Sequence, residues 1–562
     1  MKLKNKFSPD YNEFLSDQNY SRLIVIGVVF FAIYSYIIIR LFVLVTGNGE
    51  ANELKLTSSN KNLYERGEIV DRNGEILAVN LATASLYANP SNIFDSKEVA
   101  QKLIQIFPDL NFKKLYNDLS SDKKFVWVKR NITPKEQFAV NNLGIPGLIF
   151  ENGQKRVYLH GNILSHVLGY VDLDGNGIAG IEKFFDKDLA GNGSKKQLSL
   201  SIDMRVQNIV HEEILRAKEK YDADGAMAVV ADANTGEIYS MVSLPDFDPH
   251  YPNKASDEEL FNRASLGVFE LGSIFKPLSF AMVLDAGVVT TDSVYYVRNP
   301  IKVSRFKITD YRRKKDWMSV PEILMYSSNI GTARMILELG VDGHKKYLEK
   351  FGFNKKLNIE LPEKGLPILP SPKLWNEVNS ITMSYGHGFA FTPLHMVEAF
   401  AAVVNGGNKY PLTLVKDKNE NAVVEKIISK DVSQTLNKLL RLVVEKGYGR
   451  LGEVKGYYVG GKTGSADKPT KGGYSTNAKL SSFISAFPMQ NPKFVVMVTL
   501  DNPKKGAAQT TVGGRAASPI AAEIIAKIAP VLKISPELEN AEQINEKLYI
   551  NYSLESEAIN VS

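Results

Sequence analysis

The stretch "GVFELGSIFKPLSF" (residues 267–280) places one serine and one lysine in a run of apolar residues that is typical of a buried helix. Ser273 and Lys276 are three positions apart, and residues at this spacing are neighbours on the surface of a helix. Gly272 precedes the serine and allows the chain to turn into the helix. We therefore predict that Ser273 lies in the first helical turn, within reach of the Lys276 amine.

The Ser273–Lys276 pair has two interpretations. A serine hydroxyl is a weak nucleophile until an adjacent base takes its proton, and a lysine is such a base only when its pKa falls. Burial beside Phe275 and Leu278, or a second cation nearby, would lower that pKa. Backbone N–H groups in the first helical turn would also stabilise an oxyanion. Taken alone, however, the pair is better explained as a capping serine beside a lysine whose amine reaches solvent.

Two motifs further along the chain favour the catalytic interpretation. The stretch "MYSSNIGTARMILELG" puts Ser327 and Asn329 just before a helix, and their spacing suits a turn that points both side chains inward. The stretch "VGGKTGSADK" places Lys462, Thr463, Gly464 and Ser465 at the end of a strand pattern. The glycines in this stretch allow another part of the backbone to approach closely. Ser-x-x-Lys, Ser-x-Asn and Lys-Thr-Gly, in this order, are the motifs of penicillin-binding proteins and class A β-lactamases.

The composition is that of a globular protein and carries no metal or cofactor signature. The 562 residues are 44% hydrophobic and 23% charged, and the net charge of +6 is too small to indicate a nucleic-acid partner. Cysteine is absent, which excludes disulfides, thiolate nucleophiles and thiolate metal sites. The seven histidines contain no His-Glu-x-x-His pair, so a zinc hydrolase is not indicated. We expect no metal and no cofactor.

An apolar segment near the N-terminus predicts a membrane anchor. Residues 23–45 contain a single charge, Arg40, and as a helix they would span roughly 35 Å at about 1.5 Å per residue. A cleaved signal peptide is the alternative, but the segment is too long for an apolar signal core and no small-x-small cleavage pattern follows it. Basic residues in the preceding segment favour a cytoplasmic N-terminus, which places the rest of the chain on the outer, periplasmic side.

Strand and turn signals beyond the anchor indicate an α+β protein. Hairpins are predicted around Asn73-Gly74 and Asn234-Thr235-Gly236, and a helical block, three strand patterns and a closing helix (516–532) follow. This order favours an antiparallel sheet packed by helices. The predicted domains are a cytoplasmic N-terminus (1–22), a transmembrane anchor (23–45), a non-catalytic module (46–205), a catalytic domain (206–535) and a loosely held polar tail (536–562).

One glycine-rich stretch has features of two other kinds of binding loop. "DLDGNGIAGIEK" (172–183) has acidic residues at calcium-loop offsets, but Lys183 stands where the ion needs a bidentate glutamate. It also holds a Gly-x-Gly-x-x-Gly pattern after the strand-like "HVLGYV", but the helix that a dinucleotide fold requires breaks early at "GNGS". We therefore interpret this stretch as a turn.

With these motifs in place, the chain beyond the anchor resembles the class B penicillin-binding proteins, which are membrane-anchored peptidoglycan transpeptidases. "RGEIVDRNG" (66–74) looks like the first pedestal motif of that family, and "HVLGYV" with "GIAGIEK" resembles later ones. "LPDFDPH", "SYGHGFAFTPLHM" and "VVNGGNKYP" are similar to segments of its transpeptidase domain. The resemblance implies a five-stranded antiparallel sheet flanked by helices, preceded by an α+β pedestal of the dimerisation type and one transmembrane helix.

The resemblance also implies catalytic roles for five residues of the three motifs. Ser273 would be the acylated nucleophile, and Lys276 would be the base that activates it. Ser327 would relay a proton to the leaving D-alanine, and Asn329 would hydrogen-bond the amide of the donor peptide. Lys462 would supply the second cation, which lowers the pKa of Lys276 and holds Ser327 in place.

The other residues of the third motif would bind the substrate. Thr463, Gly464 and Ser465 would hold the end of the donor peptide, with the two hydroxyls on its terminal carboxylate. The backbone N–H groups of Ser273 and Ser465 would form the oxyanion hole. The strand that carries Lys462 would pair with the extended peptide as an added strand.

Three residues depart from the usual pattern of the family. Leu271 and Ile274 stand where proline and threonine are usual, and we expect them to alter the packing beside the nucleophile. Ser465 replaces a common threonine but keeps the hydroxyl. None of the three changes removes a catalytic group.

The implied function is cross-linking of stem peptides that end in D-Ala-D-Ala, in septal wall synthesis during cell division. β-Lactams would acylate the same serine, and a membrane glycosyltransferase and other division proteins would be partners, with no nucleic acid. The alternatives are an elongation-type transpeptidase, a D,D-carboxypeptidase or β-lactamase-type hydrolase, and a largely non-catalytic scaffold of the division machinery.

Overall fold

The computed structural model describes residues 24–40, 66–190, 197–303, 306–311, 315–419, 424–470, 473–505 and 514–552. The chain forms two compact units, residues 1–63 and 64–562. In the first unit, residues 24–40 form a helix whose side chains are almost all exposed. Among the described residues, no helix is both long and apolar enough to cross a membrane. Leu23, residues 41–45 and the predicted cytoplasmic segment 1–22 lie outside the described residues.

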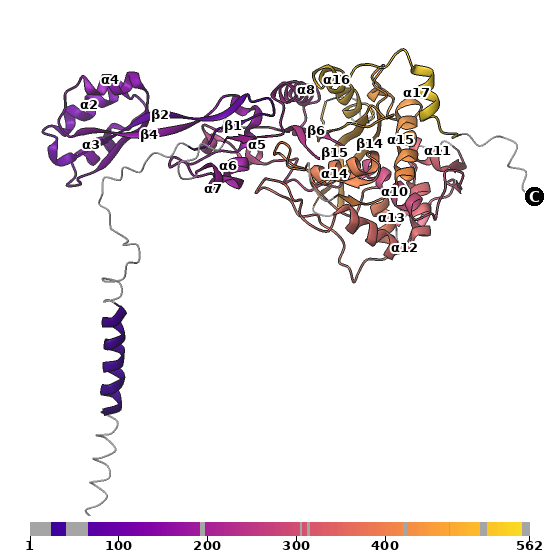
Figure 1. The fold of residues 1–562 in the computed structure, drawn as a ribbon, viewed down its shortest axis with the longest axis horizontal. Coiled ribbons are helices and arrows are strands. Elements are labelled where there is room, and N and C mark those ends of the chain that lie inside the picture. Colours follow the sequence, from indigo (N-terminus) through magenta and orange to yellow (C-terminus); the bar gives the residue numbers. More distant parts are fainter. Residues whose placement is uncertain are drawn as a thin grey trace, which may run out of the picture. The chain divides into compact units, whose positions relative to one another are not determined.

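The pedestal begins the second unit with a five-stranded sheet in the order β3-β2-β1-β5, in which β4 also pairs with β2 (Figure 1). The hairpin predicted at Asn73-Gly74 is present, since β1 and β2 pair antiparallel around it. Asp95 and Thr133 accept backbone N–H bonds as N-caps and so begin α2 and α4. The elements are β1 (Ile69–Val70), β2 (Ile76–Ala88), α2 (Ser96–Ile106), α3 (Phe112–Leu119), β3 (Val126–Ile132), α4 (Pro134–Asn141), β4 (Leu148–Tyr158) and β5 (Leu198–Ser199).

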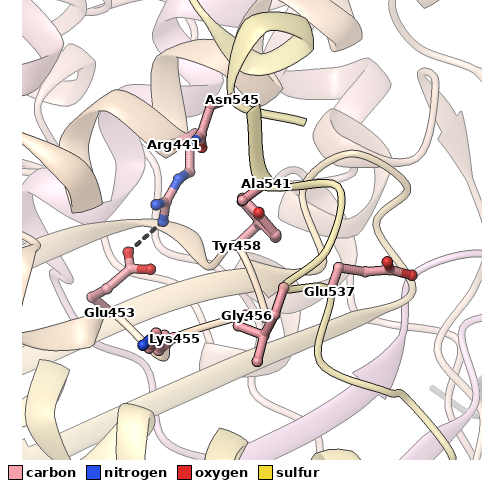
Figure 2. A pocket seen from close by; sticks show the side chains of 9 residues that line it. Arg441, Glu453, Lys455, Gly456, Tyr458, Glu537, Ala541 and Asn545 are labelled. Atoms are coloured by element: carbon pink, nitrogen blue, oxygen red, sulfur yellow. Dashed lines mark hydrogen bonds and ion pairs between the residues drawn. The ribbon is translucent and has the colours of Figure 1, made fainter. Parts of the chain in front are cut away.

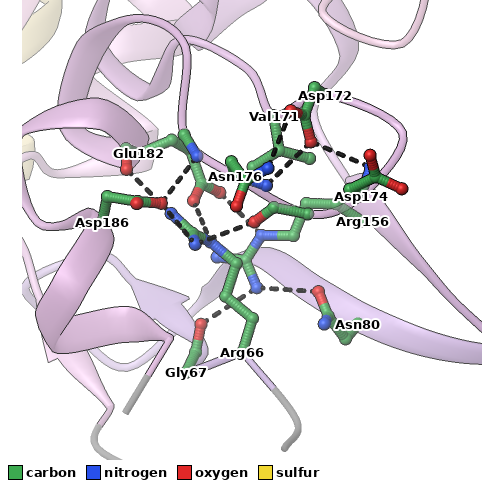
Figure 3. Close-up of polar contacts among 12 residues, drawn as sticks. Arg66, Gly67, Asn80, Arg156, Val171, Asp172, Asp174, Asn176, Glu182 and Asp186 are labelled. Atoms are coloured by element: carbon green, nitrogen blue, oxygen red, sulfur yellow. Dashed lines mark hydrogen bonds and ion pairs between the residues drawn. The ribbon is translucent and has the colours of Figure 1, made fainter. Parts of the chain in front are cut away.

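A buried charge cluster joins the start of the pedestal to two short helices, α6 (Gly180–Phe184) and α7 (Asp186–Leu189), as Figure 3 shows. Arg66 and Arg156 each donate through Nε to Glu182, with both N–O distances at 2.6 Å. Arg66 also donates to Asp186 at 2.9 Å, and Glu182 is completely buried. Because a buried charge without its partner is costly, these contacts hold the first residues of the pedestal against α6 and α7.

The turn predicted at residues 172–183 is present, but the stretch before it is not a strand. Residues 165–168 form a short helix, α5 (Ser165–Leu168), whose four side chains are all buried. Gly169 then has a φ of 70°, and a Cβ there would lie 1.9 Å from the Ala179 carbonyl oxygen. The Asp172 carboxylate accepts backbone N–H bonds from Asp174 and Asn176, so its oxygens stabilise the turn itself. The strand-like pattern of "HVLGYV" was misleading because every side chain of α5 packs into the core.

The catalytic domain is built on a second five-stranded sheet, in the order β14-β15-β16-β6-β7. Every neighbouring pair is antiparallel, which confirms the predicted sheet, and β14 is its edge strand. The three strand patterns and the hairpin predicted at residues 224–243 all lie in this sheet. The strands are β6 (Gly225–Asp232), β7 (Ile238–Leu244), β14 (Gly460–Thr470), β15 (Gly473–Phe487) and β16 (Phe494–Asp501).

Two hydrophobic cores cover the two faces of this sheet. Side chains of β6 alternate between them, with Val229 in one core and Val230 in the other. α8 and α16 cover one face, and α10 and α14 contribute to the core on the other. The helices of the domain are α8 (Met204–Tyr221), α9 (Asp257–Leu260), α10 (Lys276–Asp285), α11 (Val320–Met325), α12 (Asn329–Phe351), α13 (Glu377–Ser384), α14 (Pro393–Val404), α15 (Lys430–Glu445), α16 (Ala517–Val531) and α17 (Ala541–Leu548).

Short two-stranded ribbons connect the helices. β9 pairs with β10, β8 with β11, and β12 with β13, each pair antiparallel. The ribbon β9–β10 precedes α11 and carries the chain to Asp310, which reaches the active site. The bounds are β8 (Val294–Tyr296), β9 (Ile301–Val303), β10 (Phe306–Ile308), β11 (Trp317–Ser319), β12 (Asn408–Lys409) and β13 (Glu425–Lys426).

The described part of the C-terminal segment is packed more closely than its polar composition predicts. It forms α17, and Leu548 is only 7% exposed. The Ser319 hydroxyl donates to the Tyr552 carbonyl at 2.9 Å, and the Glu537 N–H donates to the Gly456 carbonyl at 2.9 Å. A cavity of about 420 Å³ lies between this segment, α15 and the approach to β14 (Figure 2), and Arg441 and Glu453 are paired in its wall.

Candidate active site

The predicted nucleophile lies in a tight turn that leads directly into α10. Residues Gly272–Phe275 form a single turn of 3-10 helix, and Lys276 is the first residue of α10. Gly272 has a φ of 61°, and a Cβ at this position would lie 2.8 Å from the Ser465 carbonyl oxygen. The Gly272 N–H donates to the Gly386 carbonyl at 3.1 Å. Both the backbone conformation and the close approach of β14 therefore require glycine beside Ser273.

Lys276 is a completely buried amine. Its neighbour Phe275 packs its ring against those of Phe389 and Phe353, with centroids 4.9 Å and 5.5 Å away. Lys276 Nζ donates to the Ser327 carbonyl at 2.6 Å and to Ser327 Oγ at 3.1 Å. This contact brings the Ser-x-x-Lys motif and the Ser-Ser-Asn motif together, although they are separated by a long stretch of sequence.

The Lys276 amine also donates to Asn329 Oδ1 at 2.8 Å. The Lys276 backbone N–H donates to the Ser273 carbonyl, but among the described residues no hydrogen bond joins the Lys276 amine to the Ser273 hydroxyl, so the amine is held by the second motif. Ser327 has a φ of 55°, a left-handed conformation that turns its side chain towards the amine. The expected inward turn of Ser327 and Asn329 is thus present at the N-terminus of α12.

Asp310 completes the second motif, and the sequence analysis did not identify it. Its carboxylate accepts from Ser328 Oγ at 2.7 Å, from the Asn329 N–H at 2.6 Å and from the Ile330 N–H at 3.0 Å. A carboxylate at a helix N-terminus satisfies free N–H groups and complements the helix dipole. Asp310 therefore fixes the start of α12, on which Asn329 lies.

Lys462 is the second buried lysine of the site, on β14. Burial lowers its pKa from the ordinary lysine value to about 7. The pKa of Lys276 lies well below its ordinary value, first because of burial and next because of the positive charge of Lys462, while the Asp310 carboxylate acts in the opposite direction. A lysine in this environment can hold its amine neutral and so act as a base near neutral pH.

The third motif packs against the turn that carries Ser273. A Cβ on Gly464 would lie 2.7 Å from Ile274 Cγ2 and 2.8 Å from the Leu271 carbonyl oxygen. Leu271 and Ile274, which depart from the usual family pattern, are both buried and line this contact. Thr463 is largely buried, whereas the Ser465 side chain is exposed. All three motifs therefore meet where the edge of β14 faces the start of α10.

The arrangement defines a serine acyltransferase. A serine at the start of a helix and two buried lysines of lowered pKa are the residue types that such a reaction requires as nucleophile, base and cation. The described residues contain no cluster of three or more histidine, aspartate or glutamate side chains placed to hold a metal ion.

The chain belongs to the penicillin-binding proteins. Residues 226–526 match the penicillin-binding protein transpeptidase domain, and residues 62–218 match the penicillin-binding protein dimerisation domain. The two matches together cover both the catalytic domain and the pedestal.

Three curated relatives are similar over most of their length. The probable peptidoglycan D,D-transpeptidase FtsI of Caulobacter vibrioides is 35% identical, over 84% of this chain and 82% of the relative. The probable peptidoglycan D,D-transpeptidase PenA of Neisseria gonorrhoeae is 31% identical, over 84% and 85%. The peptidoglycan D,D-transpeptidase FtsI of Escherichia coli is 26% identical, over 84% of each chain.

Two solved structures share the fold. A peptidoglycan synthetase from Bifidobacterium adolescentis has a TM-score of 0.66 at 23% identity, covering 84% of this chain and 96% of its own. Penicillin-binding protein 3 from Mycobacterium tuberculosis, complexed with ampicillin, matches with the same TM-score, identity and coverage. At this identity the likeness supports the fold of both domains and no finer detail.

Proposed function

We propose that Ser273 is the acylated nucleophile of a peptidoglycan D,D-transpeptidase and that Lys276 is its base. The observation that carries the proposal is the complete burial of the Lys276 amine between Ser327 and Asn329, with its pKa held well below the ordinary lysine value. The neutral amine takes the Ser273 proton as the hydroxyl attacks the carbonyl of the penultimate D-alanine. Ser327, which already contacts the amine, then passes a proton to the leaving D-alanine.

The donor peptide binds along the free edge of β14. Thr463 and Ser465 hold its terminal carboxylate, and Lys462 supplies a cation beside it. The N–H groups of Ser273 and Ser465 stabilise the oxyanion, and the packing of β14 on the Ser273 turn supports this assignment. An amine from a neighbouring stem peptide then attacks the acyl-enzyme and forms the cross-link. β-Lactams acylate the same serine, and the reaction uses no metal or organic cofactor.

The biological setting is septal wall synthesis in cell division, as in the division-specific type, penicillin-binding protein 3. The names of the FtsI relatives support this assignment. Residues 23–45 anchor the chain in the cytoplasmic membrane, with residues 1–22 in the cytoplasm and the two folded domains in the periplasm. The apolar sequence of the anchor supports this topology. A membrane glycosyltransferase and other division proteins are the expected partners.

One experiment separates this function from a hydrolase and from a scaffold. The full-length protein is incubated with labelled penicillin, and the adduct is mapped and followed over time, with Ser273→Ala as control. A long-lived adduct on Ser273 is expected. Turnover of the adduct within seconds indicates a β-lactamase, and the absence of any adduct contradicts the catalytic assignment.

A further inference from the structure

We propose that His250 makes the junction between the pedestal and the catalytic domain sensitive to pH. Its imidazole contacts the Tyr158 backbone on β4, and this contact exists only while the ring is neutral, so acidification releases it. The proposal concerns how the two domains are held together, and it does not depend on the reaction proposed for Ser273.

The loop that follows β7, residues 245–250, joins the two domains. The Asp246 carboxylate accepts a hydrogen bond from Asn162 Nδ2 of the pedestal at 2.9 Å. The same carboxylate pairs with His211 Nε2 of α8 at 2.7 Å. His250 ends the loop and provides its contact with β4. The loop therefore touches the pedestal at two points and the catalytic domain at α8.

His250 binds a backbone donor at the edge of the pedestal sheet. In the described sheet, β4 pairs only with β2. The Leu159 N–H donates to the Leu77 carbonyl of β2 at 3.1 Å, so the N–H of Tyr158, one residue earlier, points to the opposite, free edge. There it donates to His250 Nε2 at 3.0 Å, and the two rings lie edge to face with centroids 5.4 Å apart.

These contacts determine where the ring carries its proton. A backbone N–H can only donate, so Nε2 of His250 is an unprotonated acceptor. The proton is then on Nδ1, which donates to Asp248 Oδ1 at 2.8 Å. A second proton would place an N–H against the Tyr158 N–H, so the charged ring keeps its bond to Asp248 and loses the bond to Tyr158. Tyr158 is a buried residue, and leaving its N–H without an acceptor is costly.

Two other histidines touch this loop, and they respond differently to protonation. His166 Nε2 lies 3.2 Å from the Pro245 carbonyl, and His211 Nε2 lies against the Asp246 carboxylate. A carbonyl or carboxylate oxygen accepts, so Nε2 carries a proton in both rings, and protonation of the other nitrogen leaves these bonds in place. Of the three histidines, only His250 loses its contact when it becomes charged.

The groups around the imidazole make the two states compete. Asp248 faces it from its own loop and Tyr158 faces it from β4. Partial burial acts to raise the pKa of Asp248, but hydrogen bonds from the His250 backbone and ring and the charge of Lys254 lower it below its ordinary value. Asp248 is therefore an anion in the range where histidines titrate, about pH 5 to 8, and stabilises the charged ring. Burial raises the pKa of Tyr158, so its phenol stays neutral while its N–H stabilises the neutral ring.

The test is hydrogen exchange of the full-length protein at about pH 7.5 and about pH 5.5, which bracket the ordinary titration of histidine. Mass spectrometry of a peptide that contains the Tyr158 amide gives its protection, corrected for the intrinsic effect of pH on exchange. We expect this protection to be about fivefold lower at the acidic pH. His250→Gln places a carbonyl oxygen near the position of Nε2 and does not titrate, so its protection is the same at both pH values. His250→Phe has no acceptor, and its protection is low at both.

The matched control is His160→Gln, because His160 is close to Tyr158 in the pedestal but pairs with Glu75, at 3.3 Å. This variant keeps the wild-type response to pH. Exchange in α8 reports that each variant is folded, and the comparison of wild type with His250→Gln decides the outcome even if His250→Phe does not fold. Equal protection of the Tyr158 amide at the two pH values in wild type, or a wild-type response in His250→Gln, overturns the proposal.

Discussion

The amine of Lys276 donates a 2.8 Å hydrogen bond to Oδ1 of Asn329, and among the described residues it forms no hydrogen bond with the Ser273 hydroxyl. The base of the proposed reaction is therefore positioned by the Ser-Ser-Asn turn, while the nucleophile is positioned by a separate turn packed on β14. Lys276 connects the two turns, because its backbone N–H donates to the Ser273 carbonyl while its amine bonds Ser327 and Asn329.

Lys276→Ala is expected to abolish acylation by penicillin while the melting temperature stays near that of wild type. The reaction loses its base. The fold loses three hydrogen bonds of the amine, but it is also relieved of an amine whose burial is unfavourable, so the two effects on stability oppose each other. Acylation is measured by stopped-flow quenching or mass spectrometry, and stability by differential scanning calorimetry. Acylation at the wild-type rate would remove Lys276 from its proposed role.

Asp310→Asn should slow acylation by about three- to tenfold, because the start of α12 loses a charged cap that contacts two backbone N–H groups. The substitution should also change how the acylation rate depends on pH, and this change is specific to the charge of Asp310. The Asp310 carboxylate raises the pKa of Lys276, so its removal lowers that pKa further. Because the neutral amine is the active form, the acidic limb of the acylation rate profile should move to lower pH.

The measurement is the acylation rate as a function of pH for wild type and Asp310→Asn. Asp316→Asn is a suitable control, since Asp316 is a nearby carboxylate in an exposed pair with Arg298 at 3.1 Å. A uniform fall in rate at every pH would assign Asp310 a structural role only.

Glu182→Leu should destabilise the protein by about 3–5 kcal/mol, because it leaves the buried guanidinium groups of Arg66 and Arg156 without their carboxylate. Denaturant unfolding of the full chain measures the loss. Glu136→Leu in the same domain removes an exposed capping-box carboxylate and is expected to cost about 1 kcal/mol. Equal losses in the two variants would contradict the importance of the buried cluster.

The sequence predicted the features that depend on local pattern. The sheet strands alternate between two cores, and the first and third motifs contain the glycines that their close packing requires, Gly272 and Gly464. Asp310 was missed because Ser328 and Asn329 lie 18 and 19 positions further along the chain, and nothing in its neighbours marks it as a cap.

Two other features also depend on tertiary contacts. The α5 segment looked like a strand, but it is a buried helical turn that ends at Gly169, where a Cβ would collide with the Ala179 carbonyl. The C-terminal α17 is polar, yet Leu548 finds an apolar surface to pack against. In each case, a distant partner determined the outcome and local propensity did not.

Gly272→Ala tests the contact between the nucleophile turn and β14. The substitution strains a φ of 61° and also places a Cβ 2.8 Å from the Ser465 carbonyl oxygen. We expect a loss of about 2–4 kcal/mol in stability and a fall in acylation of at least tenfold, because the oxyanion hole is displaced. Gly287→Ala is the matched control: its φ is 69°, but a Cβ there meets no atom within 4 Å. A similar loss of acylation in both variants would mean that backbone strain alone explains the effect.

Lys462→Met tests the cost of burying the second cation. Lys462 has a pKa of about 7 in the folded protein and about 10.5 when unfolded. The unfolded chain therefore binds more protons between these two values, and the contribution of Lys462 to stability rises with pH across that window. At neutral pH the burial costs on the order of 4 kcal/mol, since one pKa unit corresponds to about 1.4 kcal/mol.

Lys462→Met should thus be more stable than wild type near pH 7, with the difference shrinking towards pH 10, while acylation falls because the cation is lost. Denaturant unfolding at a series of pH values measures the difference, and a gap that stays constant with pH would show that Lys462 is not the titrating group.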